Sequence, residues 1–164
     1  MAEIDYVIPA IKIEQKATFN FADLYRLLKS WFDLHSYDFF EKEYIDVLKE
    51  GGEKSDSIKW EAEKKIDDYI KFHIEIRLKL SDVVNVQTKE AMACKGVCSL
   101  KFESFIQKDY EDLWERNFFL KFSRALYDHF IMKAKYDRYA DELKKETYEV
   151  FNQAKSFLNL RGER

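Results

Sequence analysis

The most regular pattern in the chain is an alternation of apolar and polar residues in the stretch "YIKFHIEIRLKL", residues 69–80. Every even-numbered position from Ile70 to Leu80 is apolar, and every odd-numbered position from Lys71 to Lys79 is charged or His. Successive side chains of a strand point to opposite faces, so the pattern predicts a strand with one buried face. Burial of that face stabilises the fold by about 25 cal/mol per Å². We expect the charged row, including His73, to be the solvated back of a sheet.

Four more stretches are candidates for strands. Residues 10–21 ("AIKIEQKATFNF"), 58–66 ("IKWEAEKKI") and 91–107 ("AMACKGVCSLKFESFIQ") combine alternation with β-branched and aromatic residues. Gly96 in the last of these marks a kink or bulge. Residues 37–48 are compatible with either helix or strand, and their aromatic and β-branched content favours a strand.

The loop that joins residues 58–66 to the alternating strand can be predicted from register. Both segments place their apolar residues at even positions, so a hairpin that buries both sets needs a loop of three or five residues. A five-residue loop places Glu61 opposite Arg77, whereas a three-residue loop places it opposite Glu75. Like charges directly opposed are unfavourable, which favours the five-residue loop.

The period changes to that of a helix in two parts of the chain. Asn20 is a candidate N-cap for a helix that runs to about His35. A second helical pattern begins near Asp112, and an amphipathic stretch at residues 139–160 follows, either as one long helix or after a bend near residues 135–141. Between the patterns, the polar run "KEGGEKSDS" at residues 49–57 predicts a loop. We expect the sheet to pack on the apolar stripe of residues 113–130.

These elements predict an α+β domain with a curved, mainly antiparallel sheet packed on a long C-terminal helix. The order of strand, helix, long meandering strands and final aromatic helix resembles the helix-grip arrangement of the START-like and Bet v 1-like family. That resemblance covers residues 11–135 and implies a cavity between sheet and helix. We therefore expect one domain at residues 1–137 and a helical extension at residues 138–164.

Composition narrows the class of protein. The chain has 164 residues, 46% hydrophobic and 36% charged, which suits one globular domain. A net charge of −3 argues against a protein built to neutralise phosphate, so nucleic acid is not the expected partner. The sequence contains no apolar run of the roughly 20 residues that span a bilayer and no signal-peptide pattern, and we expect a cytoplasmic protein.

The sequence contains no recognisable catalytic or cofactor signature. Cys94 and Cys98 lie about 13 Å apart along a strand, too far for a disulfide, and are expected to be free thiols on one face. His35, His73 and His129 form no zinc-ligand spacing with them, so neither a metal nor a cofactor is expected. No nucleophile elbow, glycine-rich phosphate loop or metalloprotease motif is present, which favours a non-enzymatic protein.

Two functions remain. The first is a carrier that holds an apolar small molecule or lipid between the sheet and the C-terminal helix. Its expected lining residues are Trp60, Lys64, Ile74, Ile76, Leu78, Phe118 and Phe122. Lys64 falls on the apolar face, where it either reaches out to solvent at the sheet edge or meets an anionic group of the ligand.

The second function is an interaction or structural subunit with a filled core. In that case the C-terminal amphipathic helix docks on a second copy or on another protein, unless it packs back over the helix predicted to end near His35, which is the commonest outcome for such a stripe. The side chains expected to make this contact are Leu143, Val150, Phe151, Phe157 and Leu158.

Overall fold

The computed structural model of the chain describes residues 3–48, 54–87, 92–110 and 118–162. Helices and strands follow one another as β1 (Glu3–Phe19), α1 (Phe21–Leu34), β2 (Asp38–Leu48), β3 (Lys54–Lys65), β4 (Ile70–Gln87), β5 (Met92–Lys108), α2 (Phe118–Tyr127), the π-helical turn η1 (Asp128–Met132) and α3 (Lys133–Asn159).

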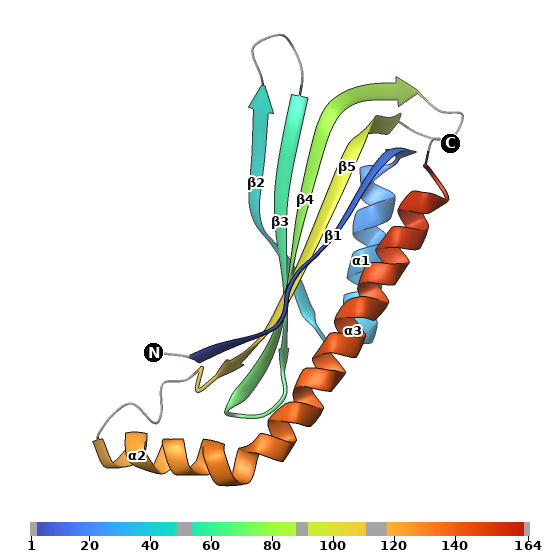
Figure 1. The fold of residues 1–164 in the computed structure, drawn as a ribbon. Coiled ribbons are helices and arrows are strands. Elements are labelled where there is room, and N and C mark those ends of the chain that lie inside the picture. Colours follow the sequence, from blue (N-terminus) through green and yellow to red (C-terminus); the bar gives the residue numbers. More distant parts are fainter. Residues whose placement is uncertain (1–2, 49–53, 88–91, 111–117, 163–164) are drawn as a thin grey trace.

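The five strands form one open antiparallel sheet in the order β1-β5-β4-β3-β2. Helices α1 and α3 lie side by side on one face of this sheet (Figure 1). The predicted α+β class is confirmed, and so is the strand at residues 37–48. The predicted glycine turn at Gly51 and Gly52 falls outside the described residues, whereas Lys54–Ser57 belong to β3.

Helix α1 begins where the sequence predicts. The Asn20 side chain accepts a hydrogen bond of 2.8 Å from the backbone N–H of Ala22, which satisfies one of the free donors of the first turn. The helix ends at Leu34, and His35 is its C-cap. Of the stripe that the helical spacing predicts, Leu24, Leu28 and Trp31 are buried and Leu27 is half-buried, whereas Leu34 is 80% exposed.

One hydrophobic core lies between the sheet and the two helices. The even-numbered side chains of β4 from Ile70 to Leu80 are all buried there, as the alternation predicts. Rings connect the two layers, with Phe72 against Tyr139 at 5.9 Å between centroids and Phe102 against Phe151 at 5.5 Å. Helix α1 covers the β3 side of the sheet, and α3 covers β1 and β5.

The prediction that the sheet grips residues 113–130 is wrong. The helix packed against the sheet is α3, while α2, which precedes the bend at η1, lies beyond the end of the sheet (Figure 1). Residues 111–117 lie outside the described part. The domain boundary expected at residues 137 and 138 falls within α3, whose buried side chains belong to the same core as those of the sheet.

The prediction of a five-residue hairpin loop is also wrong. Glu61 lies opposite Glu75, and the backbone N–H of Ile66 donates to the carbonyl of Ile70 at 3.0 Å. The loop therefore contains three residues, and the carboxylate of Asp67 stabilises it by accepting two backbone N–H groups at 2.9 and 2.7 Å. The opposed carboxylates are tolerated because lysines of neighbouring positions neutralise them. Their ion pairs are Lys42 with Glu61 at 3.3 Å and Lys59 with Glu75 at 3.0 Å.

The irregularity predicted at Gly96 lies in the strand beside it. Strand β4 shifts register between Ser81 and Val84, where Asp82 has a φ of 55°. A Cβ atom on Gly96 would lie 2.8 Å from the carbonyl oxygen of Ser81, so this close approach of two strands requires glycine.

The back of the sheet is less uniformly solvated than the alternation predicts. Arg77 and Lys79 are exposed, but only 4% of the surface of His73 is accessible to solvent. The His73 ring stacks on Phe105 at 4.7 Å between centroids. His73 is therefore a buried histidine, contrary to the expectation of a surface residue.

Candidate functional site

Those residues expected to line a cavity that the structure describes lie in two separate places. Trp60, Ile74, Ile76 and Leu78 are fully buried in the core beneath the helices. The Phe118 side chain lies outside the described part, and Phe122 lies on the surface of α2 with 59% of its area exposed. The described members of the predicted site are therefore divided between the core and the surface of α2.

The residues expected to bind a partner are in the core of this chain. Leu143, Val150 and Leu158 are fully buried, Phe157 is 6% exposed, and Phe151 is half-buried against the ring of Phe102. The stripe that they form was identified correctly, but the sheet and α1 already cover it. A partner could reach it only by displacing α3.

Lys64 meets an anionic group, but that group belongs to the same chain. Its Nζ atom donates to Glu146 Oε1 on α3 at 2.9 Å, and the Tyr37 hydroxyl donates to Glu146 Oε2 at 2.5 Å. Burial, together with the Glu146 carboxylate, raises the pKa of Tyr37 far above its ordinary value, so the phenol stays a donor. This network fastens α3 to β3 and to Tyr37, the residue before β2, and leaves Lys64 engaged within the fold.

An exposed apolar face lies on α2 and η1. It consists of Phe119 (74% exposed), Phe122 (59%), Leu126 (44%), Phe130 (74%) and Ile131 (65%). The first four recur at spacings of three, four and four residues, which aligns them along one side of a helix. Large exposed apolar patches on folded domains are commonly interaction sites.

Polar contacts of Arg124 and a ring contact of Tyr127 hold α2 against the body of the protein. Arg124 on its inner side pairs with Glu3 at 3.0 Å and with Asp109 at 3.4 Å, and donates to the Tyr69 hydroxyl at 3.0 Å. The Tyr127 ring packs edge-on against Tyr69. Because Arg124 anchors the inner side, the apolar face points outward.

The charge around this helix differs in sign from that of the whole chain. Residues 118–138 contain five Lys or Arg and two Asp, a net charge of +3, whereas the chain carries −3. Lys121, Lys133 and Lys135 are exposed. The exposed apolar face is thus accompanied by cations. The sequence interpretation missed it because it assigned the same stripe to the core.

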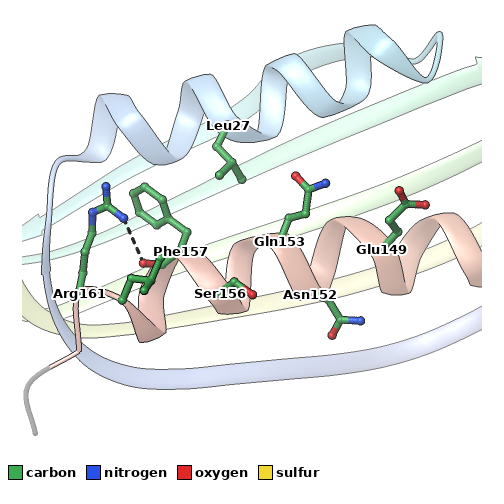
Figure 2. Close-up of a pocket in the computed structure, with 8 residues that line it drawn as sticks. Leu27, Glu149, Asn152, Gln153, Ser156, Phe157 and Arg161 are labelled. Atoms are coloured by element: carbon green, nitrogen blue, oxygen red, sulfur yellow. Dashed lines mark hydrogen bonds between the residues drawn. The ribbon is translucent and has the colours of Figure 1, made fainter.

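A second apolar feature is the groove between α1 and α3, with a volume of about 600 Å³ (Figure 2). Leu27 points from α1 toward α3, and Phe157 and Gln153 point back toward α1. The groove closes at the end of α3, where Arg161 Nη1 donates to the carbonyl of Phe157 at 3.3 Å. It is open to solvent, on the outer side of the helical layer.

Both cysteines are free thiols, as predicted. Burial raises the pKa of Cys98 to about 12, which keeps it protonated and a weak nucleophile at neutral pH. Burial also raises the pKa of Cys94, which is only half-buried. Neither thiol has the environment of a catalytic cysteine.

No protein-family model matches this chain, and no curated protein matches it either. Among the described helices, none is long and apolar enough to cross a membrane.

Proposed function

We propose that the protein is a non-enzymatic binding protein that attaches to anionic lipid surfaces through the exposed apolar face of α2 and η1. The observation that carries this proposal is the outward orientation of Phe119, Phe122 and Phe130 on a helix anchored by Arg124. Interfacial helices insert aromatic and aliphatic side chains into the boundary between headgroups and acyl chains.

Charge supports a lipid surface over a second copy of the chain. Lys121, Lys133 and Lys135 accompany the exposed apolar face, and each cation near an anionic bilayer contributes about 1 kcal/mol. Pairing two copies of this positively charged helix would bring like charges together, which is unfavourable. An extended, negatively charged surface satisfies both the apolar and the cationic side chains.

The position of α2 in the molecule also supports this proposal. Helix α2 projects beyond the end of the sheet, and the length of α3 separates it from α1 (Figure 1). A helix at such a place can lie flat on a bilayer while the sheet and α3 stay in water. The binding step needs no rearrangement of the core.

The test is cosedimentation of the full chain with phosphatidylcholine vesicles, prepared with and without phosphatidylserine. We expect binding only to the anionic vesicles. The double variant Phe122→Ser, Phe130→Ser should lower the bound fraction at least about tenfold, since each Phe withdrawn from water contributes about 1.5–3 kcal/mol. Raising the salt to about 1 M should also weaken binding, because the Debye length falls from about 10 Å to about 3 Å.

The matched control is Leu34→Ser, which removes an 80% exposed apolar side chain from α1, away from the proposed surface. It should bind vesicles like the natural chain. Equal loss in Leu34→Ser, or no binding to anionic vesicles, would overturn the proposal. So would a natural chain that sediments as a dimer and becomes a monomer in the double variant, because the exposed apolar face would then be a protein interface.

The groove between α1 and α3 supports a second candidate, the binding of an apolar small molecule. Its volume of about 600 Å³ falls in the range typical of small-ligand sites. We expect saturable binding of a fluorescent long-chain fatty acid that Leu27→Trp abolishes by filling the groove. Leu34→Trp, on the same helix but outside the groove, is the control, and equal binding by all three chains would exclude the groove.

A further inference from the structure

The back of the sheet carries a buried histidine between two carboxylates. Glu61 and Glu63 lie on one face of β3, and His73 lies directly opposite Glu63 on β4. His73 is 4% exposed and Glu61 is 8% exposed, whereas Glu63 is half-buried. This arrangement follows from the three-residue loop, because the alternative register would move His73 two residues along β3.

One oxygen of each carboxylate converges on the same imidazole nitrogen. Nδ1 of His73 lies 3.2 Å from Oε1 of Glu61 and 3.8 Å from Oε1 of Glu63. One ligand atom from each of the three residues lies within 4.8 Å of the others. The other two oxygens face lysines, with Lys42 at 3.3 Å from Oε2 of Glu61 and Lys71 at 3.1 Å from Oε2 of Glu63.

The far side of the imidazole ring is held in place. Nε2 of His73 lies 2.7 Å from Oε1 of Gln107, and the ring stacks on Phe105 with an interplanar angle of 9°. A donor bond from Nε2 to the Gln107 oxygen places the Nδ1 lone pair toward the two carboxylate oxygens. Three electron-rich atoms then face one another, and either a hydrogen on Nδ1 or a metal ion between them removes the repulsion.

We propose that Glu61, Glu63 and His73 form a binding site for a divalent transition-metal ion of the Zn²⁺ class. Zinc binds carboxylate oxygen and imidazole nitrogen at about 2.0–2.2 Å, which places the ligands of a tetrahedral site about 3.3–3.6 Å apart. The two measured separations of 3.2 and 3.8 Å bracket that spacing. A water molecule would complete the coordination.

The surroundings have the features of a metal site. Metal-binding histidines donate their second N–H to an oxygen that fixes the ring, and Gln107 supplies that oxygen here. The ligating carboxylates are hydrogen-bonded on their outer oxygens, by Lys42 and Lys71. The side chain of Glu63, which is 25% exposed, leaves an entry path from solvent. A mixed nitrogen and oxygen set suits Zn²⁺ better than Mg²⁺ or Ca²⁺, which prefer oxygen alone.

The experiment is a calorimetric titration of the metal-free full chain with Zn²⁺, accompanied by thermal unfolding with and without the ion. We expect one Zn²⁺ per chain and a higher Tm in its presence, because a ligand that binds only the native state stabilises it. His73→Ala should abolish the site. Gln107→Ala, which removes only the group that orients the ring, should weaken affinity about 10–100-fold.

Glu63→Gln tests the site without creating a cavity, since it keeps the shape of the side chain and removes its charge. It should also lose most of the Zn²⁺ affinity. Two controls should bind like the natural chain, namely His129→Ala at an exposed histidine and Glu75→Gln on the same face of the sheet. The proposal fails if Zn²⁺ produces neither heat nor a shift in Tm, or if Glu63→Gln binds it with unchanged affinity. Loss of binding in His129→Ala would place the ion elsewhere and equally refute the site.

Discussion

A chain that ends after Asp137 is expected to be unfolded. The truncation removes Leu143, Val150 and Leu158, all fully buried against the sheet, together with the carboxylate of Glu146 that pairs with Lys64. Deleting one buried Leu side chain costs about 2–5 kcal/mol, and the stability of a whole domain is about 5–15 kcal/mol. The loss of the entire stripe therefore exceeds the available stability.

Far-ultraviolet circular dichroism and urea titration give the measurement. The truncated chain should lack a cooperative unfolding transition, while a control that ends after Gly162 should unfold like the natural protein. A folded, monomeric truncated chain would show that α3 is an appendage, as the sequence interpretation assumed when it placed a boundary at residue 137.

Replacing Phe by Ala is expected to affect stability very differently in the two apolar stripes of the C-terminal helices, the buried stripe of α3 and the exposed stripe of α2 and η1. Phe157 on α3 is 6% exposed and packs edge-on against Phe19, whereas Phe130 on η1 is 74% exposed. We expect Phe157→Ala to reduce the free energy of unfolding by about 3–5 kcal/mol. The same substitution at Phe130 should change it by less than about 0.5 kcal/mol.

Both variants are compared with the natural chain by urea titration monitored by tryptophan fluorescence. The two substitutions delete the same atoms, so their difference reports burial alone. Equal destabilisation, or a larger effect at Phe130, would mean that the outer stripe is also covered in the folded protein and would contradict the structure.

The strands could be predicted because alternation reports directly on which face is buried. The alternation from Ile70 to Leu80 was enough to predict a strand and its buried face. Asn20 indicated where α1 begins, because its side chain can cap a helix. The wrong prediction was which of the two helical stripes packs against the sheet. Periodicity shows that a stripe exists, but not which surface covers it, and the richer aromatic content of residues 118–130 favoured the wrong one.

The prediction of the hairpin register was wrong for a different reason. The rule that opposed like charges are unfavourable was applied to Glu61 and Glu75 as an isolated pair. Lys42 reaches Glu61 from β2, a strand that was not part of the comparison, at a point where β2 shifts register between Glu41 and Glu43. The candidate metal site depends on that same register, so it could not be found before the strand pairing was known.

The π-helical turn η1 determines which way the outer helix faces. The helical path bends at this turn, so the axis of α2 leaves the direction of α3 (Figure 1). On one side of the turn, α3 lies over the sheet and buries Leu143, Val150 and Leu158. On the other side, Phe119 and Phe122 of α2 remain exposed. One turn of irregular helix thus separates a part that completes the core from a part whose apolar side chains stay outside it.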